Sequence, residues 1–216
     1  MKAAIEAATA KGIPVVAFNA GADAWQSMGG SRSSSARTST SPARARVSAW
    51  RPTVPRRPSA SSRSRATWGL ESRCAGVKNA FPPATEVLNV NGKDMPSVES
   101  TITAKLQQDP GVDYVVTLGA PFAMTAVQSV KNAASKAKVG TFDTNAALVD
   151  AIKAGDVQWA VDQQPFLQGY LAVDSLWLYI NNGNVLGGGQ PTLTGPSFID
   201  KSNIDAVAEY AKAGTR

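Results

Sequence analysis

Short continuous apolar runs alternate along the chain with segments in which hydrophobic residues recur every three or four positions. The apolar runs predict strands at 85–90, 114–118, 139–143 and 157–161, because strands buried on both faces are apolar throughout. Helical spacing predicts helices at 97–108, 122–134 and 145–154, and a long helix that begins after Pro165. This alternation predicts an α/β fold with a doubly wound parallel sheet.

The amino-terminal residues show half of such a unit. A helix is expected to end at Gly12, followed by an apolar strand at 13–18 and a loop at 19–23. Further along, the sequence ESRCAGVKNAF has helical spacing, and its apolar residues share one face that we expect to be buried, namely Cys74, Val77 and Phe81.

Residues 30–69 interrupt the pattern with a stretch rich in arginine, serine, alanine and proline. They include nine of the 22 basic residues and no Asp or Glu, and without them the chain has 13 basic and 16 acidic residues. The net charge of +6 is therefore a property of one segment and indicates little about the rest. Such a segment is either an arm that binds a polyanion or a stretch translated out of frame.

The codons that this stretch allows favour the second interpretation. One constant shift of frame on GC-rich codons converts SSARTSTSP into VGQDEYVA, and it converts PSASSRSRATWG into VCVIQEQGNVG, which contains an apolar strand. We therefore predict a pair of compensating insertions or deletions, one near Gly29 or Gly30 and one near Gly69. As translated, residues 30–69 lack the apolar residues that a core strand needs, and we expect them to be disordered.

Several residue types are scarce or missing. The chain has no histidine and a single cysteine, Cys74, so catalytic triads, histidine-containing zinc sites and an internal disulfide are excluded. No strand end pairs a nucleophile with a base, so the sequence predicts no catalytic residue, no metal ligand and no cofactor, and we do not expect an enzyme. The stretch MKAAIEAATAKG lacks the pattern of a signal peptide, and the chain as written is expected to stay in the cytoplasm.

Ligands of doubly wound sheets bind beyond the carboxyl ends of the strands, which directs attention to the loop starts at 19, 119–122, 143–145 and 162–164. These loops carry amides, carboxylates and an aromatic ring, groups that suit hydrogen bonding to a polyhydroxylated ligand. Asp143 and Asn145 have an equally good alternative role as caps of the helix that follows.

Five segments in a fixed order resemble the periplasmic sugar-binding proteins of ABC importers, of the ribose-binding type: KGIPVVAFNAG, LESRCAGVKNAF, VVTLGAPFAMTAVQSVK, VGTFDTN and WAVDQQPFLQGYLAVDSLWLYINNG. The resemblance covers residues 1–29 and 70–216. It implies the type I periplasmic binding protein fold, in which two doubly wound lobes hold a monosaccharide or similar polyol. It also implies a monomer, a membrane permease as partner, an export or lipoprotein signal, and a periplasmic or cell-surface location.

Carried over to this sequence, the resemblance places Asn19 in the ligand cleft on the amino-terminal lobe. Arg73, Asp143 and Gln163 then form a polar clamp from the other lobe and the hinge. A guanidinium and a carboxylate can each make two strong hydrogen bonds to neighbouring sugar hydroxyls.

Two further candidates complete the expected site. Phe122 offers an apolar face to the sugar ring, and Asn145 is a weaker polar candidate. Ala120 stands where the family often has asparagine, which puts one expected hydrogen bond in doubt.

Relative to the family, the sequence begins after the first strands and helices of the amino-terminal lobe. We expect an incomplete amino-terminal lobe made of 1–29 and 165–190, the aberrant segment 30–69, and a carboxyl-terminal lobe made of 70–163 and 191–216. With one lobe truncated and the frame damaged, sugar binding is expected to be weak or absent.

Two alternative functions stay open. An arginine-rich segment can bind RNA while disordered, but Trp50 and Trp68 are isolated and no nucleic-acid-binding fold accompanies them, so no nucleic-acid partner is expected. The effector domain of a lac-repressor-like regulator shares the predicted fold, but it requires a helix-turn-helix that this sequence does not show.

Overall fold

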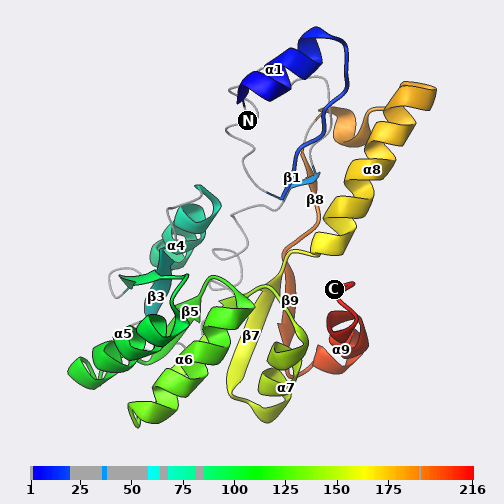
Figure 1. Ribbon diagram of the computed structural model, residues 1–216. Helices are drawn as coiled ribbons and strands as arrows, with labels where there is room; N and C mark the ends of the chain where they lie inside the picture. Colours follow the sequence, from blue (N-terminus) through cyan, green and yellow to red (C-terminus); the bar gives the residue numbers. More distant parts are fainter. Residues whose placement is uncertain (1, 20–35, 38–57, 64–67, 81–84, 190) are drawn as a thin grey trace. The chain divides into compact units, whose positions relative to one another are not determined.

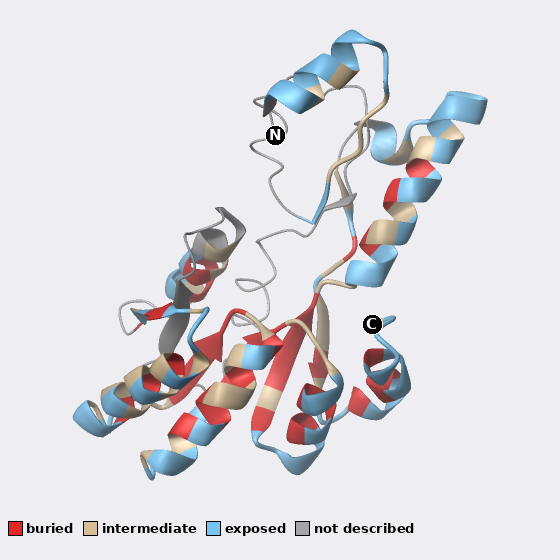
Figure 2. Cartoon of the chain, viewed as in Figure 1, coloured by how far each residue is buried: buried red, intermediate tan, exposed pale blue. Residues whose placement is uncertain are grey.

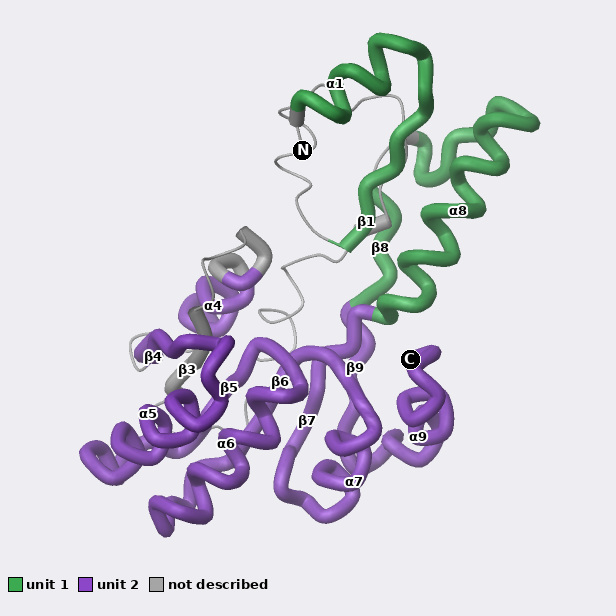
Figure 3. Tube along the Cα trace, viewed as in Figure 1, with its two compact units in different colours: residues 1–39, 164–195 green, residues 40–163, 196–216 purple. Residues whose placement is uncertain are grey.

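The computed structural model describes residues 2–19, 36–37, 58–63, 68–80, 85–189 and 191–216. The chain divides into two compact units (Figure 3). Unit 1 comprises residues 1–39 and 164–195, and unit 2 comprises residues 40–163 and 196–216. The chain therefore passes into unit 1 between Gln163 and Gln164 and returns to unit 2 between Gly195 and Pro196.

Unit 2 contains a six-stranded sheet with the order β4-β3-β5-β6-β7-β9 (Figure 1). Neighbouring strands pair in parallel, except that β9 runs antiparallel to β7. The strands are β3 (Pro58–Arg63), β4 (Glu86–Asn91), β5 (Tyr114–Thr117), β6 (Lys138–Phe142), β7 (Val157–Asp162) and β9 (Ser197–Asp200). The parallel strands and the helices between them confirm the predicted α/β fold.

The described helices of unit 2 are α4 (Trp68–Ala80), α5 (Met95–Gln108), α6 (Ala120–Asn132), α7 (Ala146–Ala154) and α9 (Ile204–Lys212). Local sequence sets several of their ends. The Asp94 side chain accepts a hydrogen bond from the Ser97 N–H at 3.1 Å where α5 begins, and Gly155 ends α7 in the left-handed conformation with φ of 85°. The predicted helices at 97–108, 122–134 and 145–154 are confirmed to within about two residues.

The unit 2 sheet carries a hydrophobic layer on each face, and strands β5, β6 and β7 are largely buried (Figure 2). Helices α5, α6, α7 and α9 cover one face, which includes Val115 of β5. The other face holds Val116 together with Cys74 and Val77 of α4. Neighbouring residues of β5 thus enter opposite layers, which explains why this strand is apolar along its length.

An aromatic stack lies in the second layer. The rings of Tyr114 and Trp159 are stacked with their centroids 6.1 Å apart, and the centroids of the Trp159 and Phe198 rings lie 5.8 Å apart. A Cβ added at Gly140 would come within 2.5 Å of the indole ring, so Trp159 occupies the space that a side chain would need. Burial raises the pKa of the Tyr114 phenol because the charged form would lose its hydration.

Unit 1 contains α1 (Lys2–Ala10), α8 (Pro165–Asn182), the 3-10 helix η1 (Leu186–Gly189) and a parallel sheet of very short strands. The sheet order is β1 (Phe18–Asn19), β2 (Ala36–Arg37) and β8 (Thr192–Leu193). The predicted strand at 13–18 is corrected, because among the described residues the pairing begins at Phe18 and β1 comprises Phe18 and Asn19. The described part of β2 consists of the two residues that pair with them.

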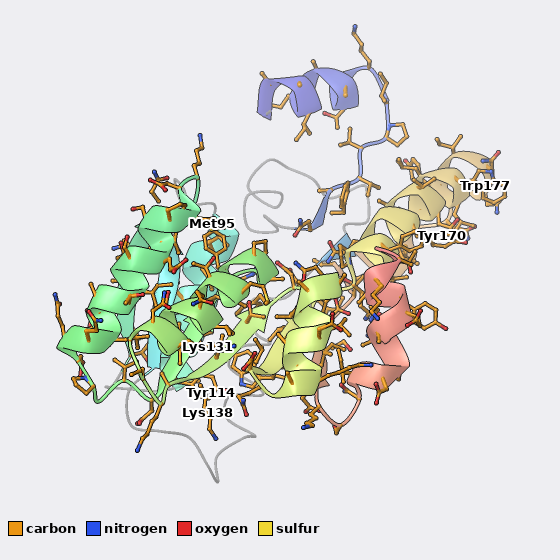
Figure 4. The ribbon with its side chains drawn as sticks, turned by 60° about the horizontal axis from the view of Figure 1, so that its bottom comes forward. Met95, Tyr114, Lys131, Lys138, Tyr170 and Trp177 are labelled. Carbon is orange, nitrogen blue, oxygen red and sulfur yellow. The ribbon has the colours of Figure 1, made fainter. Side chains whose placement is uncertain are left out.

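Helix α8 carries large apolar side chains on its exposed side. Its buried side carries Gln168, Ala172 and Ser175. The opposite side carries an exposed row that we call the α8 stripe, made of Phe166, Tyr170, Val173, Trp177 and Ile180. Its members are between 54% and 70% exposed. Figure 4 labels two of them, Tyr170 and Trp177. Among the described residues, neither α8 nor any other helix combines the length and the hydrophobicity that crossing a membrane requires.

The expectation of disorder for residues 30–69 is corrected at two places. Ala36–Arg37 form β2, and Pro58–Arg63 form β3, which pairs with β4 on one side and β5 on the other. Ladder hydrogen bonds join backbone groups, so two flanking strands can hold a segment whose side chains do not favour a strand. Residues 30–35, 38–57 and 64–67 of this stretch lie outside the described residues, as does Phe81.

Candidate ligand-binding site

The unit 2 sheet has a topological switch point between β3 and β5. The chain leaves β3 through α4 to its neighbour β4, and then returns through α5 to β5 on the other side of β3. Helices α4 and α6, which follow β3 and β5, consequently pack on opposite faces of the sheet. Ligands of open α/β sheets bind in the crevice at the carboxyl edge where the connections diverge in this way.

Arg73 reaches this edge from α4. Its Nη1 atom donates a hydrogen bond to the carbonyl oxygen of Leu118, directly after β5, at 3.0 Å. Its guanidinium carbon lies 4.7 Å from the centre of the Phe142 ring, at the end of β6, within the range of a cation–π interaction. The side chain is 15% exposed. Strand ends therefore hold a guanidinium, which has five N–H donors, in a largely buried position.

Asp143 and Gln163 extend the cluster along the same edge. Asp143 follows β6, and its Oδ2 atom lies 3.5 Å from Nη1 of Arg73. Gln163 follows β7, and its Nε2 atom donates a hydrogen bond to Oδ1 of Asp143. The Asp143 side chain is 41% exposed. A carboxylate has about four acceptor positions, so Asp143 can accept further hydrogen bonds from solvent or from a ligand.

Strained backbone marks the ends of these strands. Among the described non-glycine residues, positive φ angles occur at Asn19, Asp143 and Gln164, each at or just after a strand end, and at Ala134. The φ of Asp143 is 64°, and its N–H donates to the Val161 carbonyl at 2.9 Å. Left-handed backbone at non-glycine residues costs energy and is concentrated at functional sites, so the φ of Asp143 supports the end of β6 as part of a candidate site.

Phe122 lies beside the polar cluster. A Cβ added at Gly119 would lie 3.8 Å from Cδ2 of Phe122 and 4.0 Å from Oδ2 of Asp143, so the ring and the carboxylate flank this glycine. A Cβ added at Gly92 would lie 2.9 Å from the Phe122 ring. The ring is partly buried and packs against the larger core layer. Phe122 therefore has a packing role and also borders the site.

The two asparagine candidates differ in their settings. The side-chain oxygen of Asn145 accepts a hydrogen bond from the Leu148 N–H at 2.8 Å and caps α7, which is the alternative role considered for this residue. Asn19 belongs to β1 in unit 1, with φ of 77°. The structure therefore brings together Arg73, Asp143, Gln163 and Phe122 of unit 2, and the ligand roles of all six candidates stay predictions.

Other groups at this edge carry little or no signal in the sequence. The Leu118 carbonyl is backbone, which any residue would supply, and Phe142 reads as an ordinary core residue. Arg216 is also unforeseen, although it donates a hydrogen bond to Asp162 at 2.7 Å. The available signal was Asp162 itself, a carboxylate at the end of an apolar strand, because a buried carboxylate requires a partner.

The chemistry of the cluster is that of hydrogen bonding. Arg73 donates, Asp143 accepts and Gln163 can do both, which matches the donors and acceptors of neighbouring hydroxyl groups. No group of His, Cys, Asp and Glu that could hold a metal ion occurs in the part of the chain that the structure describes. A doubly wound sheet with such an edge is typical of proteins that bind a small polar ligand.

Comparison with known proteins narrows this class. The family described as "Periplasmic binding protein domain" matches residues 66–184. A carbohydrate transporter from Acidothermus cellulolyticus, solved in complex with myo-inositol, is 47% identical with a TM-score of 0.93, over 100% of this chain and 75% of that chain. A comparison with curated protein sequences gives no match.

Two more distant structures share the fold. A periplasmic solute-binding protein of an ABC transporter from Actinobacillus succinogenes, with bound D-allose, is 19% identical with a TM-score of 0.79, over 95% of this chain and 75% of that one. An ABC-transporter solute-binding protein from Agrobacterium vitis, with bound α-D-tagatopyranose, is 21% identical with a TM-score of 0.75, and the match covers 99% of this chain and 74% of that one.

The chain belongs to the periplasmic binding protein family. The relatives described above are sugar-binding proteins of ABC transporters with the type I fold. This confirms the resemblance found in the sequence. Because the relatives are solute-binding proteins, the expectation that the chain is not an enzyme is also confirmed.

Proposed function

We propose that this chain is a substrate-binding protein of an ABC-type importer that binds a monosaccharide or a cyclic polyol such as myo-inositol. The observation that carries the proposal is the cluster of Arg73, Asp143 and Gln163 at the switch point of unit 2. Its chemistry suits vicinal hydroxyls, and the relative at 47% identity was solved with myo-inositol.

The cluster supports a definite division of roles. Arg73 is fixed by the Leu118 carbonyl and the Phe142 ring, so its remaining N–H groups can donate to ligand oxygens with little loss of side-chain freedom. Asp143 accepts from adjacent hydroxyls, and Gln163 sets the direction of the carboxylate. Phe122 borders the polar groups and offers a ring to the apolar face of a sugar.

We further propose that residues 30–69 are a frame-displaced stretch and that it impairs binding. The family match begins at residue 66, near the predicted return to frame. The structure has a strand at 58–63, where the shifted reading gives VCVIQE. As translated, this strand reads PSASSR and begins with a proline, in the middle of a parallel sheet whose other inner strands are apolar.

The remaining family properties are proposals of the same kind. An importer of this type requires a membrane permease as partner, and we propose that the chain acts as a monomer, as an exported or lipid-anchored protein outside the cytoplasmic membrane. Relatives are periplasmic proteins of ABC importers.

Isothermal titration with myo-inositol, D-allose and D-ribose tests the function. Two proteins are compared, the chain as it stands and a repaired chain in which VCVIQEQGNVG replaces residues 58–69. We expect weak or no heat from the first and saturable binding by the second, and loss of that binding when Arg73→Ala is added. A repaired chain that binds none of the polyols would refute the function, whereas micromolar or tighter binding by the unrepaired chain would refute the impairment.

A salt-titrated filter-binding assay with RNA addresses the alternative. A functional arginine-rich arm should bind and lose affinity steeply as salt rises. We expect no specific retention, since nothing in the described residues forms a nucleic-acid-binding fold.

A further inference from the structure

Two of the places where the chain passes between the units, which we call the two passages, start from one point of unit 2. The first passage follows Asp162 and Gln163, at the end of β7, and the second precedes Ser197, at the start of β9. Strands β7 and β9 are antiparallel neighbours, and Asp162 and Ser197 are paired in register. A group that contacts both residues would hold the bases of both passages together.

Arg216 is such a group. Its Nε atom donates to Oδ2 of Asp162 at 2.7 Å, and its Nη2 atom donates to Oγ of Ser197 at 2.9 Å. The Asp162 side chain is 0% exposed, and that of Arg216 is 26% exposed. A planar guanidinium can direct two N–H groups to two partners at once, which the single ammonium of lysine does less well.

The end of α9 fixes the point from which Arg216 reaches back. Gly214 has φ of 72°, and its N–H donates to the Ala211 carbonyl at 3.3 Å. The Thr215 N–H donates to the Tyr210 carbonyl at 2.9 Å. These two bonds form a Schellman motif, which stops the helix and sets the direction of the residue that follows. The backbone that leads to Arg216 is therefore held by hydrogen bonds to α9.

The same contacts lead to the candidate site. Asp162 is the neighbour in sequence of Gln163, whose side chain bonds to Asp143, and Asp143 in turn pairs with Arg73. A shift of the β7 end would move the Gln163 amide away from the carboxylate that it orients.

We propose that Arg216 is a positioning residue that joins the bases of both chain passages through Asp162 and Ser197 and thereby keeps Gln163 on Asp143. The part of the proposal that concerns ligand affinity rests on the proposed function, whereas the part that concerns the two passages does not.

Hydrogen exchange followed by mass spectrometry on the full chain tests it, with peptides that cover 161–165, 194–198 and β5. The variants are Arg216→Ala, Arg216→Lys and Ser197→Ala, with Lys212→Ala as the control, because Lys212 is a basic residue of the same region whose contact is a weak exposed pair with Glu209. We expect at least tenfold faster exchange at both passages in Arg216→Ala, a smaller effect in Arg216→Lys, and an effect confined to 194–198 in Ser197→Ala.

Exchange at the passages that matches the unchanged chain would overturn the proposal, and so would acceleration of equal size in β5, because that indicates general loss of stability. If Arg216→Ala does not fold, the same two criteria apply to Arg216→Lys and Ser197→Ala. In the repaired chain, Arg216→Ala should also weaken myo-inositol binding with partial recovery in Arg216→Lys. If no polyol binds even to the repaired chain, the proposed function fails while the exchange result still decides the role of Arg216.

Discussion

Strand β3 gives the most demanding test of the hypothesis of a shifted reading frame, because it lies between two other strands of the sheet while its residues, PSASSR, are unfavourable for an inner strand. The change is the replacement of PSASSR at residues 58–63 by VCVIQE, the shifted reading. The expected result is a higher free energy of unfolding, since the new strand would bring three larger aliphatic residues into the sheet in place of Pro58, Ala60 and Ser61.

The magnitude follows from the neighbours. The three aliphatic residues would stand at positions 58, 60 and 61, which pair with Tyr114, Val116 and Thr117 of β5, and these are at most 3% exposed. Burying one Val or Ile contributes about 1.5–3 kcal/mol, so three would contribute roughly 4–9 kcal/mol as an upper range. On the β4 side Val87 is 39% exposed, so burial there is incomplete. We therefore expect about 4 kcal/mol, at the lower end of that range.

Urea unfolding followed by tryptophan fluorescence and circular dichroism measures the gain. The matched control replaces the same residues by TSTTQE, which has comparable strand propensity and the same charge but no large aliphatic side chains. An apolar strand that stabilises the protein no more than this control would refute the reasoning, because burial would then contribute nothing at this position.

Three further predictions follow from single contacts. Gly140→Ala should lower the free energy of unfolding by about 1–3 kcal/mol and shift the emission of Trp159, and an unchanged urea midpoint would contradict the close contact. Because folding raises the pKa of Tyr114, the contribution of this group to the free energy of unfolding is fully present below the unfolded pKa of about 10 and decreases above it. Between about pH 8 and pH 11, Tyr114→Phe should therefore lose about 1 kcal/mol less stability than the unchanged protein. Equal losses in the two proteins would contradict this. Asn145→Ala should cost about 1 kcal/mol while Asn145→Asp costs little, and equal stability of all three proteins would exclude the cap.

Much of the fold could be predicted because the strands of unit 2 are buried on both faces. The run at 114–118 is apolar throughout since Val115 and Val116 enter different core layers, and such a run is distinctive in any sequence. The predictions for the two corrected segments were wrong for the opposite reason. Residues 13–17 are apolar but pair with no strand among the described residues, whereas residues 58–63 have two partner strands and no apolar pattern. Pairing between distant segments decides both cases, and the composition of one segment does not show it.

The candidate site divides along a similar line. Asp143 and Gln163 could be found from the rule that polar residues after neighbouring strands converge at one edge. Arg73 came only from the resemblance, since a residue within a helix gives no sign that it reaches a strand end. The Leu118 carbonyl could not be found, because it is backbone. For Arg216 the sequence indicates only that Asp162 needs a partner, and the partner itself lies 54 positions away.

The α8 stripe has a consequence for how long the molecule survives in a cell. Chaperones and proteases recognise exposed apolar segments, and the stripe presents aromatic and aliphatic side chains along several turns of one helix without any unfolding. Quality-control factors would therefore find a permanent target on the native state, so the lifetime of the protein would depend on access to α8 as well as on the free energy of unfolding.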